Sequence, residues 1–407
     1  MGVNTPKIRF DGFTDAWEQR KFGDVIEQSF DKNTDLQYGV TDAIGVTLTK
    51  EMIPTYANIS EDTDVSGFYL VNPNCFVYNP RTHGKKIGVG LNTSNRTYIV
   101  TFNDTVFKVK NSQADEKFLL VYMSREQWDK EACSISLGTS TIVLKWNVLC
   151  DMSFLAPSIE EQRKISELLV NLDNLITFHQ RKCDEMKELK KYMLQKMFPR
   201  EGQTVPEIRF SGFTDAWEQR KLKDIAVKVT EKNSDLIVRE TFTNSAEYGV
   251  ISQRDFFDHD ITNSENIGGY YMVRDEDFVY NPRISATAPV GPVNRNKLGR
   301  TGVMSPLYTV FRTHDVNTTY LEWFFKSSYW HSFMYFNGDS GARSDRFSIK
   351  DAIFFEMPIP MPSIDEQYRI GMLMDKLDNF ITLHQRKCDE MKELKKFMLQ
   401  KMFPEKG

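Results

Sequence analysis

Two long stretches of the chain contain cations but no carboxylates, and this charge pattern is the strongest chemical signal in the sequence. The first window lies between Asp64 and Asp104 and holds 39 residues, and the second lies between Asp277 and Asp315 and holds 37. At the chain's average acid content, each window should contain roughly five acids. A surface that pairs with phosphate avoids carboxylates, because they repel phosphate while Lys and Arg release its counterions.

Loops in these windows supply side chains that could contact a nucleic acid. Lys and Arg pair with phosphate, and Arg and Asn can also bond bidentately to guanine and adenine edges. The predicted DNA-contact residues are Arg81, Lys85, Lys86, Asn95 and Arg96 in the first window, and Arg283, Arg295, Lys297 and Arg300 in the second. Further candidates, although acids lie beside them, are Gln253, Arg254, Arg343 and Arg346. The strand parts of both windows could instead lack acids simply because they are buried.

Motifs for catalysis or cofactor binding are absent from the sequence. There is no GxxxxGK[ST] loop, no GxGxxG after a strand, no HExxH pair and no Asn-Pro-Pro-aromatic tetrapeptide of the kind that amino-methyltransferases use. Acid-x-Lys triplets such as Glu185-Met186-Lys187 fall in a predicted helix, where the strand-borne metal site of a nuclease could not form. We therefore expect no catalytic residue, no metal and no cofactor in this chain.

Composition restricts the class of protein. The chain has 407 residues, is 40% hydrophobic and carries a net charge of -4. It lacks a run of about 18 apolar residues to cross a membrane, and its first residues lack the order of a secretory signal. The five cysteines are never spaced CxxC, which suits reduced thiols. These features predict a cytoplasmic protein of two or three domains, whose net charge argues mildly against nucleic acid.

The chain repeats itself, and the repeat predicts its architecture. IRFDGFTDAWEQRK at 8–21 recurs at 208–221 with one difference, and HQRKCDEMKELKKYMLQKMFP at 179–199 recurs at 384–404 with only Tyr192 changed, to Phe397. PSIEEQ at 157–162 returns as PSIDEQ at 362–367, and FVYNPR occurs in both halves. We predict an α+β fold with a pseudo-two-fold internal repeat. It consists of two mixed α/β globules at 1–156 and 200–361, each followed by a long coiled-coil helix, at 157–199 and 362–404.

The segment from Glu160 to Met197 has the pattern of a long amphipathic helix. Ser158 is the expected N-cap and Glu161 would complete a capping box. Thirty-eight residues would extend for roughly 57 Å. Apolar residues at steps of three and four predict a packing seam in this helix and its repeat: Ile165, Leu168, Leu172, Leu175, Met186, Leu189 and Met193, then Ile370, Leu373, Leu377, Phe380, Met391, Leu394 and Met398.

Two near-identical amphipathic helices most simply bury their seams on each other. An antiparallel pair allows both helices to follow their globules and still pack side by side, which predicts a dumbbell with a globule near each end. His179, Lys182, His384 and Lys387 would form polar layers that fix the register, or less simply a pH switch or ligand site. Alternatively, each helix packs on its own globule or pairs with another chain.

This ordered set of duplicated motifs resembles the specificity subunit of type I restriction-modification enzymes over the whole chain. The resemblance rests on duplicated IRFxGFTDAWEQRK, on P-S-I-[ED]-E-Q opening a long helix, on YNPR, and on two divergent segments at 22–156 and 222–361. It implies two target recognition domains, each reading one half of a bipartite, asymmetric sequence in double-stranded DNA. The antiparallel helices would act as a ruler that sets the gap between the half-sites.

The resemblance also implies partners. Two modification subunits would bind S-adenosylmethionine, methylate adenine N6 and dock on the helices. Restriction subunits would translocate DNA with ATP and Mg and cleave it. The near-identity of the two helices fits the docking of two identical partners. Two rival interpretations stay open, a self-contained methyltransferase or nuclease and a structural adaptor whose globules bind proteins. Binding of S-adenosylmethionine or metal would favour the first rival, and salt-sensitive, sequence-selective DNA binding would exclude the second.

Overall fold

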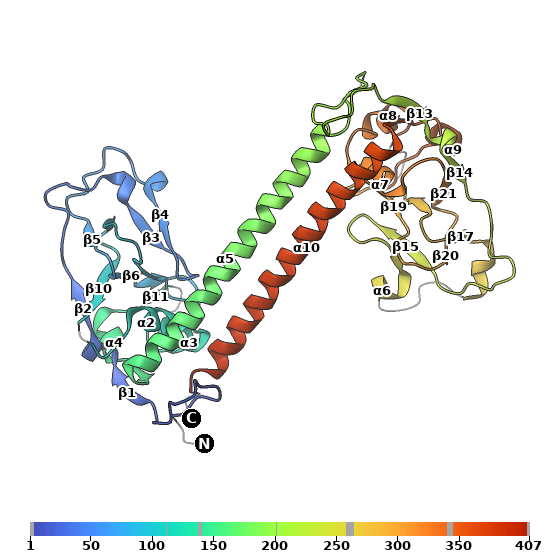
Figure 1. The fold of residues 1–407 in the computed structure, drawn as a ribbon. Coiled ribbons are helices and arrows are strands. Elements are labelled where there is room, and N and C mark those ends of the chain that lie inside the picture. Colours follow the sequence, from blue (N-terminus) through green and yellow to red (C-terminus); the bar gives the residue numbers. More distant parts are fainter. Residues whose placement is uncertain are drawn as a thin grey trace. The chain divides into compact units, whose positions relative to one another are not determined.

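The chain divides into two compact units. The computed structural model describes residues 4–110, 112–136, 141–200, 202–257, 264–339 and 345–404, without the side chains of 264–266. Unit 1 contains Met1–Gln180 and Gln385–Gly407, and unit 2 contains Arg181–His384. Each unit therefore combines one globule with half of each of the two long helices, α5 (Ile159–Lys196) and α10 (Ile364–Lys401), which are uninterrupted (Figure 1).

The globule of unit 1 is built from short strands and helices around a four-stranded antiparallel sheet in the order β2-β10-β6-β8. Its elements are β1 (Glu18–Lys21), α1 (Phe22–Val25), β2 (Ile26–Ser29), η1 (Val40–Asp42), β3 (Ile44–Val46), β4 (Met52–Pro54), η2 (Tyr56–Asn58), β5 (Tyr69–Val71), β6 (Phe76–Tyr78), β7 (Arg81–Thr82), β8 (Val89–Leu91), β9 (Tyr98–Val100), β10 (Thr105–Val109), α2 (Glu116–Met123), α3 (Glu126–Ile135), β11 (Ile142–Val143), α4 (Trp146–Asp151) and β12 (Ser153–Ala156).

The globule of unit 2 has a matching antiparallel sheet in the order β14-β21-β18-β19. Its elements are β13 (Glu218–Lys221), η3 (Leu222–Asp224), β14 (Ala226–Lys228), β15 (Phe242–Ser245), β16 (Gly249–Ser252), α6 (Gln253–Phe257), η4 (Ser264–Gly269), β17 (Tyr271–Val273), β18 (Phe278–Tyr280), β19 (Val293–Arg295), β20 (Gly302–Met304), β21 (Thr309–Thr313), α7 (Thr318–Lys326), α8 (His331–Asn337), α9 (Asp351–Phe354) and β22 (Pro358–Met361).

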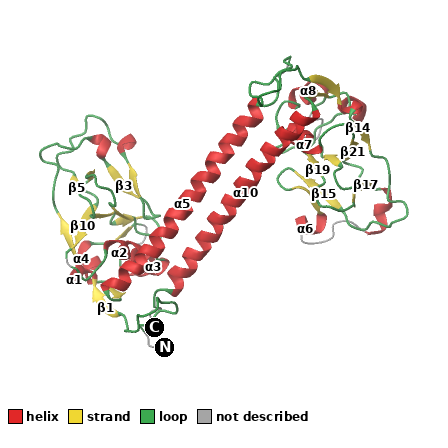
Figure 2. Cartoon of the chain, viewed as in Figure 1, coloured by secondary structure: helices red, strands yellow, loops and turns green. Residues whose placement is uncertain are grey.

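The two sheets share a core arrangement, which confirms the predicted mixed α/β class and internal repeat. Phe76 pairs with Phe107 across the first sheet, and their rings stack with centroids 4.7 Å apart. Phe278 and Phe311 occupy the same positions in the second sheet, with centroids 5.4 Å apart. Figure 2 shows the strands gathered in the globules and the long helices free of them.

The duplicated IRFxGFTDAWEQRK block joins each globule to the helices of its own unit. Its last residues form β1 and β13, which pair with the strands that directly precede the long helices, β12 and β22. Its first residues reach the end of the other helix, because the Ile8 amide donates to the Lys401 carbonyl at 3.0 Å and the Ile208 amide to the Lys196 carbonyl at 2.9 Å. This anchoring explains why the block is repeated almost unchanged.

The start of α5 has the N-cap that the sequence predicts but not the predicted capping box. The Ser158 hydroxyl accepts a hydrogen bond from the Glu161 amide at 3.4 Å, as an N-cap does. Glu161 does not complete a capping box within the described part of the chain, because both of its carboxylate oxygens accept hydrogen bonds from Arg9. Gln162 instead reaches back, donating to the Pro157 carbonyl at 2.9 Å.

The long helices run antiparallel where they meet inside each unit. In unit 1, Lys395 pairs with Asp173 at 2.6 Å, while Cys388 lies 3.8 Å from the Ile176 carbonyl. In unit 2, the Lys190 ammonium pairs with Asp378. The predicted antiparallel pairing is therefore present, and the alternative of packing on the globule is true as well: Ile165 and Leu172 are in the core of unit 1, and Ile370 and Leu377 are in the core of unit 2.

The predicted seam is wrong at three positions. Leu175 is 44% exposed, Phe380 is 50% exposed and Leu394 is 38% exposed. A strict seven-residue repeat drifts by about 20° per heptad on a straight α-helix, so an extrapolated seam leaves the buried face. Globule packing also broadens the buried face, because Leu169 and Met374 lie off the heptad pattern and are fully buried in the cores. Cys183 and Cys388 are fully buried off the pattern as well, and each contacts a carbonyl of the other long helix. The partly buried seam residues that pack against the cores are Leu168, Met186, Leu189, Met193, Leu373, Met391 and Met398.

Candidate nucleic-acid interface

The first window forms buried strands joined by exposed loops. Strands β6 and β8 are wholly buried, so the absence of acids in them needs no explanation beyond burial. Arg81, Lys85 and Lys86 lie between these strands and are exposed, and within the described part of the chain none of the three has an ion-pair partner. The loop between β6 and β8 therefore offers cations to a ligand.

A buried ion pair holds the end of this loop. Asp129 of α3 accepts hydrogen bonds from the Ile87 amide at 3.0 Å and from the Lys50 ammonium at 2.7 Å. Lys50 also lies 4.9 Å from the centroid of the Trp128 ring. Burial lowers the pKa of Lys50, while Asp129 opposes that change by stabilising the charged ammonium. Because Ile87 is fixed in this way, Lys85 and Lys86 are held on the surface next to a rigid strand.

A buried asparagine shapes a second loop, and the sequence reasoning missed its role. The Asn92 amide donates to the carbonyls of Val71 and Arg96 at 2.9 and 2.8 Å, which folds the segment into a tight turn that exposes Asn95 and Arg96. In unit 2, Asn296 likewise donates to the carbonyl of Arg300 at 3.0 Å. The shared spacing N-x-x-x-R was the signal in the sequence that could have revealed these equivalent turns.

The arginines at the two turns have carboxylate partners from earlier in the chain. Arg96 is exposed and lies 3.4 Å from Asp42. Arg300 forms a bidentate pair with Glu240 at 2.8 and 2.7 Å, which raises the pKa of the guanidinium. A phosphate would have to compete with these carboxylates. Both arginines stay at the surface, and their DNA contact remains a prediction.

Arg295 is not available to DNA, which corrects the prediction for this residue. Its side chain is 7% exposed and bonds to Glu322 at 2.8 and 3.1 Å, to Glu276 at 2.7 Å and to Thr318 at 2.7 Å. Lys297, whose side chain is 52% exposed, lies 3.4 Å from the same Glu322. The second window lacks acids in sequence, but acids from outside the window pair in space with Arg295, Lys297 and Arg300.

The remaining candidates lie in different surroundings. Arg283 is exposed and forms an antiparallel bridge with Arg346, so the fold brings together two predicted cations from distant parts of the sequence. Arg343 lies outside the described residues. Gln253 and Arg254 begin α6, directly after the β15–β16 hairpin. The exposed rings of Tyr248, in the hairpin turn, and Phe256, in α6, have centroids 6.2 Å apart. The charge analysis did not consider this aromatic feature.

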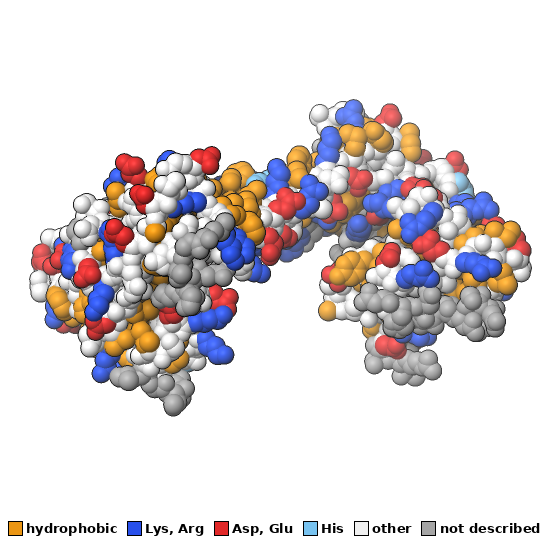
Figure 3. Space-filling model, turned by 90° about the horizontal axis from the view of Figure 1, so that it is seen from below, with side chains coloured by type: hydrophobic (Ala, Val, Ile, Leu, Met, Phe, Trp, Pro, Cys, Tyr) orange, Lys and Arg blue, Asp and Glu red, His pale blue; other side chains and the backbone are white. Residues whose placement is uncertain are grey.

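Charge on the surface is mixed. On the face seen in Figure 3, Lys and Arg side chains alternate with Asp and Glu over both globular parts. Within the described ranges, no group of three or more His, Cys, Asp or Glu side chains is arranged to hold a metal ion. None of the helices described is long and apolar enough to cross a membrane. The candidate interface is therefore a set of loops with local positive charge.

Comparison with known proteins identifies the family. The model of the type I restriction modification DNA specificity domain matches the chain twice, at residues 14–188 and 214–393. The chain therefore belongs to this family, with one copy of the domain in each half.

Individual relatives are distant. The type I restriction enzyme MjaVIII specificity subunit of Methanocaldococcus jannaschii is 27% identical over 88 residues, which cover 22% of this chain and 21% of that protein. The match thus spans about a fifth of the relative's length. The S subunit of a type I restriction-modification system from M. genitalium has the same fold, with a TM-score of 0.58, 10% identity and coverage of 98% of this chain and 99% of that one. The HsdS subunit from Thermoanaerobacter tengcongensis aligns over 96% of this chain and 97% of its own, with 16% identity and a TM-score of 0.43.

Proposed function

We propose that this chain is the DNA-recognition subunit of a type I restriction-modification complex and that each globule reads one half of a bipartite target. The observation that carries the proposal is that the two globules share one scaffold but differ in their exposed loops. Both globules have the same sheet order and the same anchoring block, yet their exposed loops present different side chains. Two globules with the same scaffold but different exposed loops suit a target whose two halves differ in sequence.

Direct readout requires side chains that reach base edges from a rigid support. In unit 1 that support is the Asn92 turn and the strand fixed by Asp129, which present Arg96 and Lys86. In unit 2 it is the Asn296 turn, which presents Arg300 and Lys297. We place Arg81, Lys85, Asn95 and Arg283 with them, and leave Arg295 out because it is buried in an ion-pair network.

Methyl transfer and DNA translocation belong, in this proposal, to partner subunits. The chain contributes binding and orientation, while S-adenosylmethionine binds to two modification subunits, and ATP and Mg bind to restriction subunits. The chain itself would need no catalytic residue and no cofactor. Membership of the specificity-domain family supports this division.

Equivalent apolar faces on the long helices suit two copies of one modification subunit. In unit 1, Leu175 and Phe178 of α5 are exposed, as are Leu394 and Phe397 of α10. In unit 2 the equivalent exposed residues are Phe380, Leu383 and Tyr192. Exposed apolar side chains that recur at corresponding positions indicate binding surfaces. We propose that each face receives one modification subunit.

Methylome sequencing tests the proposal directly. The chain is expressed with its cognate modification subunit in a host, and the host DNA is compared with that of a host lacking the chain. A new gapped, asymmetric N6-methyladenine motif is the expected result. Replacing residues 222–361 by the matching segment of a relative should then change only one half of the motif.

The control for this experiment is a chain with both globules unchanged and the exposed helix residue Arg163, which lies outside the proposed docking faces, replaced by Gln; it should leave the motif intact. If the subunits co-purify but no motif appears, the complex is tested for sequence-selective DNA binding. Absence of that binding would contradict the proposal and favour the adaptor alternative.

A further inference from the structure

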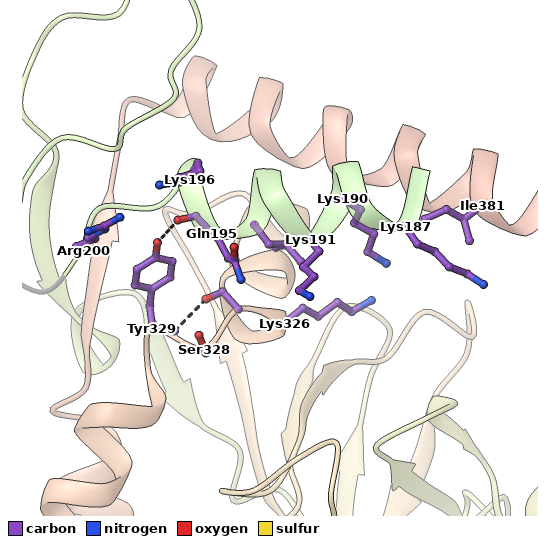
Figure 4. A pocket seen from close by; sticks show the side chains of 12 residues that line it. Lys187, Lys190, Lys191, Gln195, Lys196, Arg200, Lys326, Ser328, Tyr329 and Ile381 are labelled. Atoms are coloured by element: carbon purple, nitrogen blue, oxygen red, sulfur yellow. Dashed lines mark hydrogen bonds between the residues drawn. The ribbon is translucent and has the colours of Figure 1, made fainter. Parts of the chain in front are cut away.

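A basic pocket lies in each unit where the last turns of one long helix meet the globule. In unit 2 it encloses about 700 Å³, and its cations are Lys187, Lys190, Lys191, Lys196, Arg200 and Lys326. Figure 4 shows Lys187, Lys190 and Lys191 extending from one side of α5 toward the segment that carries Lys326. Among the described residues that line this pocket, none is acidic.

Unit 1 contains the equivalent pocket, which encloses about 780 Å³. Its helix lysines are Lys392, Lys395, Lys396 and Lys401, each 205 positions after its counterpart in α5. The globule walls correspond as well: residues 124–127 follow α2 in unit 1, and residues 326–329 include the end of α7 in unit 2. The walls differ in sequence, whereas the helix lysines are the same.

Two lysines in each pocket are available to a ligand. Lys190 and Lys395 are used in the helix pair, where they bind Asp378 and Asp173. Lys187 and Lys191 in unit 2 are exposed, and so are Lys392 and Lys396 in unit 1; within the described part of the chain none of these four has an ion pair. The spacing of four residues places each pair on one side of its helix.

Each pocket adjoins a predicted DNA-contact loop. In unit 1, Glu126 and Lys130 themselves line the pocket and form an ion pair at 2.8 Å. The pKa of Glu126 is lowered first by Lys130 and then by the charges of Lys86, in the loop, and Lys396, in the pocket. In unit 2, Glu322 lies 3.4 Å from Lys297 and 3.2 Å from Lys326, and Lys326 lines the pocket. In both units a glutamate thus lies close to a lysine of the loop and to a lysine of the pocket, so the loop and the pocket are neighbours.

We propose that these two pockets bind phosphate groups of the DNA backbone and supply affinity that does not depend on sequence. Identical residues in both units suit a ligand that is the same at both half-sites, and the backbone is the same whatever the bases are. Lysine is a flexible point charge that suits phosphate without requiring one geometry. The closeness of the pockets to the predicted DNA-contact loops favours DNA over an acidic segment of a partner protein. The proposal rests on the DNA-recognition function proposed above.

The test uses the complex with its modification subunits and a variant with four substitutions, Lys187→Gln, Lys191→Gln, Lys392→Gln and Lys396→Gln. A matched control, Arg163→Gln, Arg181→Gln, Lys376→Gln and Arg386→Gln, removes the same charge from exposed positions of the same helices outside the pockets. Fluorescence anisotropy measures binding to a duplex with the methylated motif and to a scrambled duplex, at a series of KCl concentrations.

We expect the pocket variant to bind both duplexes more weakly by a similar factor. The slope of log K against log salt should become shallower by about 1 for each lysine that contacts a phosphate. The methylome motif should stay the same, because base readout is untouched. The control should retain a slope close to that of the wild type.

Two results would overturn the proposal. One is an unchanged salt slope in the pocket variant while the wild type binds with sequence preference, which would leave the DNA-recognition function intact. The other is loss of the modification subunits from the purified variant, which would assign the pockets to a protein partner. If the wild-type complex itself binds neither duplex, both this proposal and the proposed function fail.

Discussion

Arg9 and Glu161 form a bidentate ion pair with N–O distances of 2.7 and 2.8 Å, and the Glu161 side chain is 1% exposed. Arg209 and Glu366 repeat the pair with the same distances in unit 2. In both units the arginine comes from the IRF segment and the glutamate from the first turn of a long helix. The pair therefore ties the start of the helix to the segment that also bonds to the end of the other helix.

Loss of this arginine should destabilise one unit. Arg9→Ala leaves a buried carboxylate without its partner, which costs about 3–5 kcal/mol. Hydrogen exchange should show faster opening of amides at the start of α5, while those at the start of α10 keep their protection. Arg20→Ala removes a pair with the mostly exposed Glu18 and is the control. Equal protection in the Arg9 and Arg20 variants would contradict a structural role of the pair.

Arg295 and Lys297 should behave differently although they are two residues apart. Arg295→Met removes two hydrogen bonds to the buried Glu322 and one to Glu276, while Lys297 and Lys326 stay near Glu322. It should lower the free energy of unfolding of unit 2 by about 3 kcal/mol. Lys297→Met removes a half-exposed ammonium, so it should change stability little and DNA affinity more. Urea denaturation and anisotropy measure the two effects. If the Arg295→Met protein were as stable as the wild type but bound DNA more weakly, Arg295 would contact DNA as the sequence predicted.

Unit 2 should lose stability in acid through Glu322. Burial by itself raises the pKa of this carboxyl, but the charges of Lys326, Lys297 and Arg295 together lower it below the ordinary value of 4.5. A depressed pKa contributes stability that is fully present above pH 4.5 and is lost as the pH falls through the lower, folded value. Unfolding free energies measured between pH 7 and pH 3 should fall less in Glu322→Gln than in the wild type, even though the variant is less stable at pH 7.

Each apolar helix face should hold one modification subunit. Leu175→Asp with Phe178→Asp alters the face of unit 1, and Phe380→Asp with Leu383→Asp alters that of unit 2. Native mass spectrometry should find one modification subunit per chain with either pair of substitutions and none with all four. Phe30→Asp changes an exposed apolar residue of the globule and should keep two. If each single-face variant keeps both subunits, docking occurs elsewhere.

Helix length should set the gap in the DNA target. Deleting residues 177–183 and 382–388 removes equivalent segments of α5 and α10. Seven residues correspond to about 10 Å of helix, which is about three base pairs at 3.4 Å each. Methylome sequencing should show both half-sites unchanged and a shorter gap. The ruler idea would be wrong if the complex with the shortened chain methylated the original motif.

The sequence by itself determined the repeat, the two long helices, the start of the first at Ser158, the repeated PSIDEQ block at the start of the second, and the family. These features depend on local pattern: a hydroxyl accepts from an amide three residues on, and an apolar stripe recurs with the helical period. The antiparallel pairing also followed, because two similar stripes had to be buried.

Only the tertiary structure decided which charged and apolar residues remain free. Arg295 was a DNA candidate by composition, yet Glu276 and Glu322 come from outside its window and enclose it. Leu175, Phe380 and Leu394 continued the heptad pattern, yet their faces turn to solvent. In each case the deciding neighbour lies outside the local pattern, and electrostatic and packing energies depend on distance in space rather than on separation along the chain.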